Sequence, residues 1–267
     1  MRIHHYYIYT VLLLLLASCS HIDEADRLIY VAPADVNRAV LIEDFTGQRC
    51  VNCPAATVEI EKLQEQYGRE NVIAVGIHSG PFGHRTTMSS PRMPLTTETG
   101  DAYYRHWGVE SQPGTMVNRT GGIIYDPSQY AAAVHAALQK PTPLTLHIST
   151  VTIADGQLTV TVEALSAEAL SGKLQVWLTE DNITGTQYMP DGSSNAAYVH
   201  QHVFRTSLTA DLLGDTFTVS ATEPATATYS TTLDDTWKTA DLNIVAFVYN
   251  DTDGVVQATT RAVQTTE

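Results

Sequence analysis

The sequence is short of basic residues, and this shortage excludes one large class of function. It holds 15 lysines and arginines against 29 aspartates and glutamates, a formal net charge of −14. Because nucleic-acid binding requires a basic face, neither DNA nor RNA is expected as a partner. The chain also lacks an evident internal repeat. Its 267 residues, 43 % of them hydrophobic, are enough for two modest globular domains.

Extended apolar stretches are absent except near the N-terminus, where one runs from Val11 to Ala17. It is too short for a permanent membrane span and is typical of a signal peptide, here residues 1–18. The segment ends in "LASC". This resembles the bacterial lipobox, in which signal peptidase cuts before the cysteine and its sulfur carries lipid. The resemblance implies that Cys19 is lipidated and binds a membrane through its acyl chains. The alternative is a plain secretory signal with an incidental cysteine.

Only three cysteines occur, so lipidation of Cys19 would leave Cys50 and Cys53 as the only free sulfurs. Both would lie outside the cytoplasm, where disulfides persist. Residues 19–38, which begin "CSHIDEADR", are predicted to be a flexible acidic tether. Its acidic run resembles the surface-export signals of some Gram-negative lipoproteins, and a solvated linker explains it equally well.

The remaining two cysteines lie in "DFTGQRCVNCPAA", between a predicted strand and a predicted helix. Residues 39–45 form an apolar run typical of a buried strand, and residues 71–79 form a second. Between them, apolar side chains recur at the spacing of one helix face: Ala56, Ile60, Leu63 and Tyr67. The order predicts a βαβ unit with the cysteines at its first turn.

This placement of a CxxC pair resembles that of the thioredoxins. Their strand ends in an Asp-Phe pair, and here Asp44 and Phe45 stand six and five residues before Cys50. A helix over residues 97–107, the pair Gln112-Pro113, a strand over 115–118 and a helix over 127–140 follow in the thioredoxin order. The resemblance covers residues 39–140. It implies a thioredoxin-like α/β domain with a cis bond before Pro113, packed against the disulfide.

Some positions depart from the thioredoxin pattern. Arg49 replaces the usual aromatic residue before the first cysteine, Val51 and Asn52 replace Gly-Pro, and Gly114 replaces the threonine after the proline. Residues 79–94 resemble an inserted loop. These departures leave the redox potential and the substrate groove open, and they do not affect the expected fold.

The resemblance implies thiol–disulfide exchange, in which a thiolate is the nucleophile. Cys50 is predicted to attack, because a helix N-terminus and the neighbouring Arg49 would both favour its thiolate. Cys53 is predicted to be more buried and to resolve the mixed disulfide. Asp44 would accept its proton, as the thioredoxin aspartate is thought to do. The alternative for Asp44 is an ordinary strand-end carboxylate.

Two other roles for the cysteine pair stay open. A closed zinc site needs four ligands, and no second CxxC or HxxxH accompanies the pair, although His78, His84 and His106 lie in the same domain. We therefore predict no metal and no cofactor. A structural staple would contribute little stability through so small a loop, yet weakly active CxxC pairs occur on binding proteins. An exposed Cys50 sulfur of low pKa would favour exchange, and a buried, unperturbed disulfide would favour a binder.

After "KPTPL", residues 140–144, the pattern changes to period two. "LTLHISTVTI" and "QLTVTVEAL" flank Asp155-Gly156, which predicts a β-hairpin. Further alternating runs give about eight strands in all, typical of an antiparallel immunoglobulin-like β-sandwich over residues 141–267. His200 and His202 fall two apart in "YVHQHVFR", which predicts one strand face, solvated or partly packed. A metal site there is the alternative.

The lipobox, "EDFTGQRCVNCPAA", "GVESQPGTMVNR" and "VWLTEDNITG" together resemble the outer-membrane lipoprotein family called outer-membrane protein twenty-eight. The resemblance extends over nearly all of the mature chain. It implies an α/β thioredoxin-like domain before an all-β sandwich, anchored by lipid at the outer membrane. The function we expect is exchange with extracytoplasmic thiol or disulfide proteins. The alternative is a surface or periplasmic binding protein whose CxxC disulfide is structural or vestigial.

Replacing Cys19 by alanine tests the anchor. Because the acyl chains require the cysteine sulfur, Cys19→Ala should release the protein from the membrane fraction or stop its maturation. Carbonate-washed membranes from cells making the variant measure this, with Ser20→Ala as the control. A Cys19→Ala protein that stays membrane-bound at the wild-type level would contradict lipidation.

Overall fold

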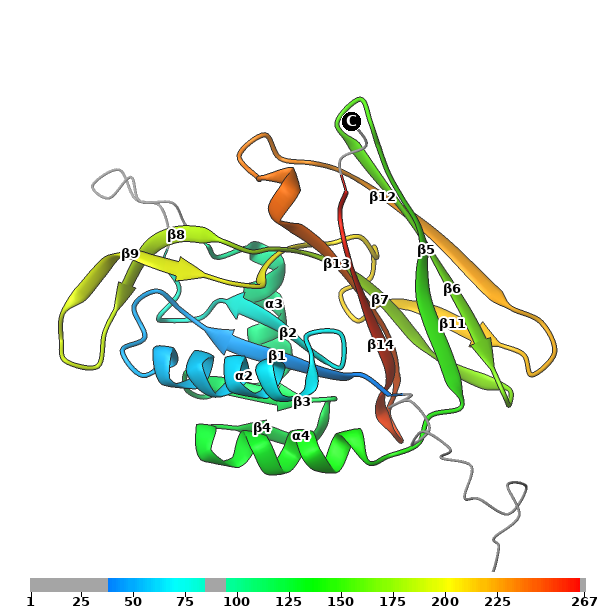
Figure 1. Cartoon of the computed structure of the whole chain (residues 1–267), viewed down its shortest axis with the longest axis horizontal. Coiled ribbons are helices and arrows are strands. Elements are labelled where there is room, and N and C mark those ends of the chain that lie inside the picture. The colour runs from blue at the N-terminus through cyan, green and yellow to red at the C-terminus, as the bar shows by residue number, and fades with distance from the viewer. Residues whose placement is uncertain (1–37, 85–94, 265–267) are drawn as a thin grey trace, which may run out of the picture. The chain divides into compact units, whose positions relative to one another are not determined.

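The computed structural model describes residues 38–84 and 95–264 and shows a mostly β chain with a few helices (Figure 1). The predicted signal peptide, Cys19 and nearly all of the tether lie outside the described residues, as do residues 85–94 of the predicted inserted loop. None of the described helices combines the length and the apolar character needed to cross a membrane.

The first half of the described chain has the predicted strand–helix–strand order. β1 and β2 pair in parallel from Val40↔Val72 to Thr46↔His78, as strands joined by a crossover helix do. β3 pairs antiparallel with β1, and β4 with β3. The elements are β1 (Val40–Thr46), α2 (Cys53–Tyr67), β2 (Val72–His78), α3 (Glu98–His106), β3 (Gly114–Val117), β4 (Thr120–Ile124), the 3-10 turn η2 (Pro127–Gln129) and α4 (Tyr130–Leu138).

The helices begin where local chemistry allows it. Pro54 lies in the first turn of α2, where its missing N–H is not needed. Thr97 caps α3, because its hydroxyl accepts a hydrogen bond from the Gly100 N–H at 2.9 Å. The predicted helices over 97–107 and 127–140 are confirmed as α3 and as η2 followed by α4.

The second half consists of strands joined by turns. β5 and β6 form the predicted hairpin, and its turn residues Asp155 and Gly156 both have positive φ, 50° and 74°, as a type I′ turn requires. The strands are β5 (Leu144–Ala154), β6 (Gln157–Ser166), β7 (Leu170–Glu180), β8 (Ile183–Tyr188), β9 (Ser194–His200), β10 (Val203–Ser207), β11 (Asp215–Val219), β12 (Ala225–Thr232), β13 (Leu242–Asn250) and β14 (Gly254–Ala262), with the 3-10 turn η3 (Thr239–Asp241) before β13.

One large sheet contains strands from both halves. Its order is β14-β13-β7-β10-β2-β1-β3-β4, with β11 paired to β7, and a separate sheet has the order β12-β6-β5. The link between the halves is short. Val203 of β10 pairs with Gly76 of β2, and the Gly76 N–H donates to the His202 carbonyl at 2.9 Å. Strands on either side of the sequence boundary at Lys140 therefore share one sheet.

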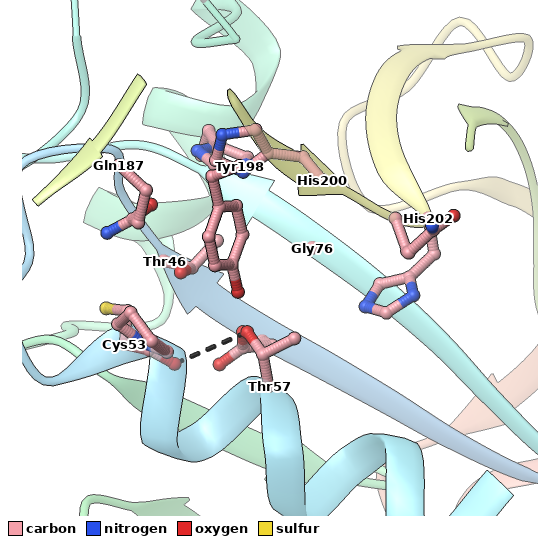
Figure 2. Close-up of a pocket in the computed structure, with 12 residues that line it drawn as sticks. Thr46, Cys53, Thr57, Gly76, Gln187, Tyr198, His200 and His202 are labelled. Atoms are coloured by element: carbon pink, nitrogen blue, oxygen red, sulfur yellow. Dashed lines mark hydrogen bonds between the residues drawn. The ribbon is translucent and has the colours of Figure 1, made fainter. Parts of the chain in front are cut away.

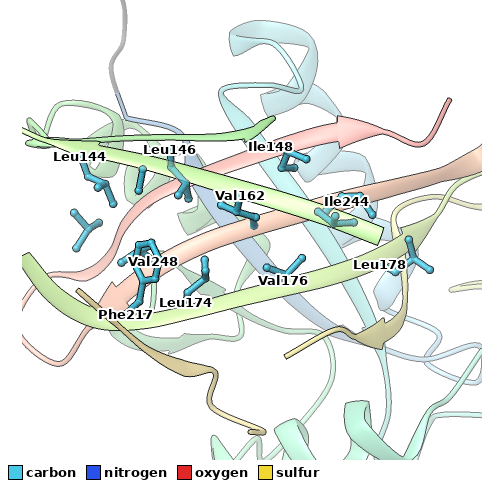
Figure 3. Close-up of a cluster of buried hydrophobic side chains, with 14 of the residues drawn as sticks. Leu144, Leu146, Ile148, Val162, Leu174, Val176, Leu178, Phe217, Ile244 and Val248 are labelled. Carbon is cyan, nitrogen blue, oxygen red and sulfur yellow. The ribbon is translucent and has the colours of Figure 1, made fainter. Parts of the chain in front are cut away.

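The three largest groups of buried apolar side chains hold the layers together. The first, which includes Leu146 and Val176, lies between the sheet β12-β6-β5 and the second-half strands of the large sheet (Figure 3). The second packs α2 and α4 on β1 and β2 and includes Ile60. The third, which includes Tyr103 and Trp177, joins α3 and β1 to β7 and β13. Each fully buried valine, leucine, isoleucine or phenylalanine side chain in these groups contributes about 1.5–3 kcal/mol to folding.

A buried ion pair lies within the third group. Arg119, in the turn between β3 and β4, makes two hydrogen bonds of 2.8 Å to the carboxylate of Glu43 on β1. The two side chains are 2 % and 0 % exposed. Four aromatic rings surround the guanidinium, with centroids 4.3–5.7 Å from its carbon: Trp107, Trp177, Phe247 and Tyr249. The cation thus bonds a carboxylate of the first half and stacks mainly on rings of the second.

Breaking this pair should destabilise both halves together. Arg119→Met leaves the Glu43 carboxylate buried without a cation, and we expect the free energy of unfolding to fall by about 3–5 kcal/mol. The double variant Glu43→Met/Arg119→Met removes both charges and should recover most of that loss. Urea unfolding followed by circular dichroism measures both. If the double variant is as unstable as the single one, the ion pair is not what stabilises this junction.

Candidate functional site

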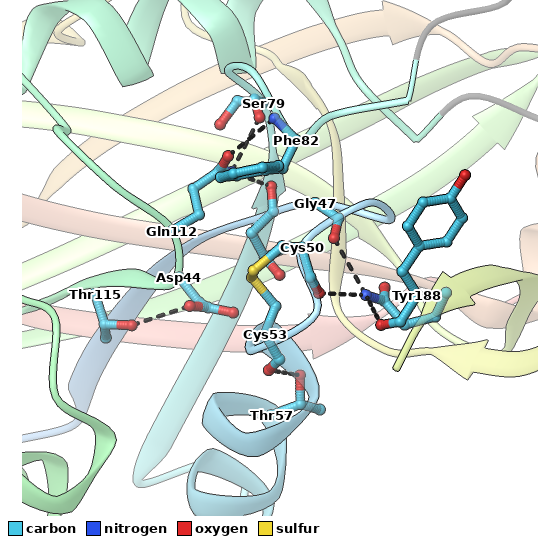
Figure 4. The surroundings of a disulfide bond; sticks show 12 residues. Asp44, Gly47, Cys50, Cys53, Thr57, Ser79, Phe82, Gln112, Thr115 and Tyr188 are labelled. Carbon is cyan, nitrogen blue, oxygen red and sulfur yellow. Dashed lines mark hydrogen bonds between the residues drawn. A yellow bond between two sulfur atoms is a disulfide. The ribbon is translucent and has the colours of Figure 1, made fainter. Parts of the chain in front are cut away.

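Cys50 and Cys53 form a disulfide between β1 and α2 (Figure 4). α2 begins at Cys53, so Cys50 lies in the turn before the helix and not at its head as predicted. The turn is tight, because the Cys50 N–H donates to the Gly47 carbonyl at 3.0 Å. The side chain of Arg49, the predicted cation beside Cys50, is exposed.

Both cysteines are buried, each with 2 % of its surface exposed. Two segments cover them. On one side the Arg49 N–H donates to the Phe82 carbonyl at 3.0 Å, and Phe82 lies over the disulfide in Figure 4. On the other side the Gln187 amide donates to the carbonyls of Cys50 at 2.8 Å and Gly47 at 3.3 Å. By the criterion set from the sequence, this burial favours a structural disulfide.

The Gln112–Pro113 peptide bond is cis, which confirms that part of the prediction; the packing of Pro113 against the disulfide stays a prediction. The Gln112 amide donates to the Thr46 carbonyl at 2.6 Å and to the Ser79 carbonyl at 3.0 Å. Its oxygen accepts from the Phe82 N–H at 3.3 Å. One side chain therefore ties the proline loop to the end of β1 and to the segment that covers Cys50.

Asp44 is a buried carboxyl on β1, 2 % exposed. The Thr115 hydroxyl donates to its Oδ1 at 2.9 Å. Burial raises the pKa of Asp44 to about 7, and the bond from Thr115 opposes that rise only in part. Thr115 also lies 2.8 Å from the hydroxyl of Tyr130, whose pKa is raised by burial and by Asp44. Near neutral pH, Asp44 can both accept and return a proton.

Asp44 and Cys53 line one small cavity (Figure 2). Its volume, about 20 Å³, is enough for about one water molecule. Residues of β1 and β2 line one side of it, and residues from the first turns of α2 line another. The second half of the chain supplies a wall of five residues: Gln187, Tyr198, His200, Gln201 and His202.

The two histidines of "YVHQHVFR" do not share a strand face, so that prediction is wrong. β9 ends at His200 and β10 begins at Val203, because His202 has a φ of 44° that breaks the strand. Neither ring is solvated: the residues are 5 % and 9 % exposed. Burial lowers the pKa of each to about 4, and burial beside His200 lowers the pKa of His78 well below its usual value. All three are neutral at pH 7.

The buried histidines do not form a metal centre with the cysteines. The rings of His78 and His200 meet edge to face, with centroids 5.1 Å apart. Across residues 38–84 and 95–264, however, no three His, Cys, Asp or Glu side chains are grouped so that they could hold a metal ion. The cavity is therefore a polar pocket of neutral rings beside one titratable carboxyl.

Reasoning from the sequence missed the residues that enclose the site. Gln187 lies 137 residues from the carbonyl that it contacts on Cys50. Tyr198 reaches from β9 toward Thr57 on α2 (Figure 2). No local sequence pattern marks either residue. Only the tertiary fold brings them to the cysteines.

Residues after the CxxC identify the family. The family model described as Outer membrane protein Omp28 matches residues 100–267. The chain belongs to the Omp28 family. The match is shorter than the nearly complete coverage expected from the sequence, and it begins after Cys53. Membership of the Omp28 family therefore carries no statement about the cysteines.

The solved structures that match this Omp28-family chain have low sequence identity to it. HBP35 of Porphyromonas gingivalis aligns with a TM-score of 0.66 and 18 % identity over 85 % of this chain and 76 % of that one. A domain of the outer membrane lipoprotein Omp28 from Porphyromonas gingivalis covers 47 % of this chain and 91 % of its own, with 18 % identity and a TM-score of 0.35. No curated protein matches the sequence. The likeness to HBP35 shows the fold alone.

The raised pKa of Asp44 makes stability depend on pH in a defined direction. A carboxyl that ionises at about 7 when folded and near 4 when unfolded binds protons more tightly in the folded state. Stability therefore falls as pH rises from about 4 to about 7. Asparagine does not ionise, so Asp44→Asn avoids the cost of a buried negative charge. Its free energy of unfolding should exceed that of the wild type by about 4 kcal/mol at pH 8, but by little at pH 4.

Urea unfolding of both oxidised proteins at the two pH values measures the difference. The buried neutral histidines act in the opposite sense, since their lowered pKa values cost stability as pH falls below about 6.5. Comparing variant and wild type at each pH cancels that contribution. A difference that does not change with pH would contradict the raised pKa of Asp44.

Proposed function

We propose that this Omp28-family protein exchanges its CxxC disulfide with thiols and disulfides of extracytoplasmic proteins. Asp44 carries the proposal, because a buried carboxyl with a pKa of about 7 shares a cavity with Cys53. Burying a carboxyl without a cation costs stability, and a structural disulfide does not need one. A titratable group perturbed in this way beside a disulfide is typical of a site that moves protons.

We assign residues 39–140 to a thioredoxin-like domain and residues 141–267 to an immunoglobulin-like sandwich. The strand order β2-β1-β3-β4, the disulfide between β1 and α2 and the cis bond before Pro113 support the first assignment. The packing of β5 and β6 against β7, β11 and β13 supports the second. Lipid on Cys19, supported by "LASC" and by the outer-membrane family, would hold both domains at the outer membrane.

The cysteines have different surroundings, which supports different roles. Cys53 lines the cavity with Asp44. Cys50 lies between the exposed residues Arg49 and Val51, so a partner would reach it first once its cover moves. Cys50 is therefore assigned the attacking role, and Cys53 the resolving role.

Exchange runs through one mixed disulfide. In the reducing direction, the Cys50 thiolate attacks one sulfur of a substrate disulfide, and the other substrate sulfur leaves as a thiolate. Cys53 then gives its proton to Asp44 and attacks the Cys50 sulfur, which releases the second substrate thiolate. Two electrons pass to the substrate and the Cys50–Cys53 disulfide forms. An external dithiol must supply two electrons for the next cycle.

The burial of the disulfide favours a second function. With both cysteines 2 % exposed, a partner sulfur cannot contact Cys50 in this conformation. A binding lipoprotein with a structural disulfide needs no such contact and fits the burial directly. The two functions differ in one requirement: exchange needs the cover over Cys50 to move.

Trapping distinguishes the two functions. Cys53→Ser cannot resolve a mixed disulfide, so it should accumulate disulfide-linked partners in the envelope, whereas Cys50→Ser should trap none. Asp44→Asn should slow the release step, because Cys53 loses its proton acceptor. Non-reducing electrophoresis of envelope extracts detects trapped species, and insulin reduction by the wild type reports turnover. If neither cysteine variant traps a partner and the wild type reduces no test disulfide, exchange is rejected and the binding function stands.

A further inference from the structure

The cover over Cys50 includes a hairpin that belongs to neither sheet. β8 and β9 pair only with each other among the described strands. β8 nevertheless lies along the turn before Cys50. The Tyr188 N–H donates to the Gln48 carbonyl at 2.8 Å, and the Gln48 amide donates to the Thr186 carbonyl at 3.0 Å. The turn is thus already occupied by an extended segment held partly through its backbone.

Side chains hold β8 at its two ends. Ile183, its first residue, is buried with Leu95 and Val203. At the end beside the cysteines, Gln187 makes hydrogen bonds of 2.8 Å and 3.3 Å to the carbonyls of Cys50 and Gly47. Individual hydrogen bonds of this kind contribute little net stability, because water replaces them when they break. Movement of β8 away from the turn would break no pairing within the large sheet, since that sheet does not include the hairpin.

Apolar side chains surround the same turn. Val51, Phe82 and Tyr188 are 40 %, 41 % and 40 % exposed, and all three are among the exposed large hydrophobic residues of the described chain. Val51 lies between the cysteines in the sequence. In Figure 4, Phe82 lies over the disulfide, and the Tyr188 ring points away from it. Exposed apolar residues gathered around a buried reactive group mark a contact surface.

We propose that Val51 and Phe82, together with the backbone of Gln48, dock an extended polypeptide segment with apolar side chains, which takes the place of β8, Tyr188 included, and uncovers Cys50. The backbone of such a segment can bond to the Gln48 carbonyl as Tyr188 does, in the manner of strand addition. Its apolar side chains would contact Val51 and Phe82 where Tyr188 had been. The net charge of −14 disfavours an acidic segment. Uncovering Cys50 has a consequence only if the proposed exchange function holds. The substrates would then be unfolded or extended protein segments.

Removing the Gln187 amide tests whether β8 restricts access to the disulfide. Gln187→Ala loses the bonds to Cys50 and Gly47, so the open state becomes more populated. The oxidised variant should be reduced by a water-soluble phosphine about tenfold faster than the wild type, as measured by maleimide labelling and mass spectrometry. Val199→Thr is the matched control, because Val199 lies exposed on the same hairpin, and its rate should equal the wild-type rate. If Gln187→Ala does not fold, Gln48→Ala, which loses the bond to Thr186, should act in the same direction.

Peptide binding tests whether an extended segment can take the place of β8. The probe is a fluorescent peptide of alternating valine and threonine with a lysine at each end and no cysteine, of about eight residues, an ordinary strand length. Its anisotropy should show binding to the wild type and about tenfold tighter binding to Gln187→Ala, since the cost of displacing β8 is reduced. A control peptide with proline at alternate positions lacks the backbone donors and should not bind.

Equal affinity of wild type and Gln187→Ala, equal affinity for the two peptides, or an unchanged reduction rate would each overturn the proposal. Its failure is separable from failure of the exchange function. Peptide binding without trapping by Cys53→Ser would keep the docking surface and reject exchange. Trapping without any preference for the extended peptide would keep exchange and reject the docking surface.

Discussion

The ion pair between Glu43 and Arg119 fixes the position of β1, the strand on which the candidate site is built. Successive side chains of a strand point to opposite faces. Glu43 points toward Arg119 and the aromatic rings of the second half, so its neighbour Asp44 must point to the other face, toward α2 and the cysteines. β1 also pairs with both β2 and β3. This buried contact thus orients β1, which lines the cavity, and β3, which follows the cis proline.

The two neighbouring carboxyls show how environment decides role. Arg119 neutralises Glu43 through two hydrogen bonds, which makes it part of the junction between the halves. Asp44, one residue later, has a hydroxyl as its hydrogen-bond donor, and burial raises its pKa to about 7. Glu43 is thus bound to a cation at the junction, whereas Asp44 can change its protonation state near neutral pH.

The sequence predicted those parts of the fold that depend on local patterns. The strand–helix–strand order, the β5–β6 hairpin and the cis bond before Pro113 each follow from spacing, turn residues or a family resemblance within a short window. Arg119, Gln187 and Tyr198 could not be found in this way, because their partners lie 76 or more residues away or on another element. The prediction that His200 and His202 share a strand face failed for a different reason. The strand ends before His202, which has a positive φ, although the alternating sequence pattern continues through it.

The burial of the cysteines follows from the strand order of the large sheet. β7 and β10 are neighbours in that sheet, and β10 is also the strand that pairs with β2. The chain between β7 and β10 is the segment that forms β8 and β9. Since β2 lies beside β1, and the disulfide follows β1 directly, any insertion between β7 and β10 emerges near the cysteines. A single pair of residues, Val203 and Gly76, is the described strand pairing between the two halves, and it places the second half of the chain over the disulfide of the first.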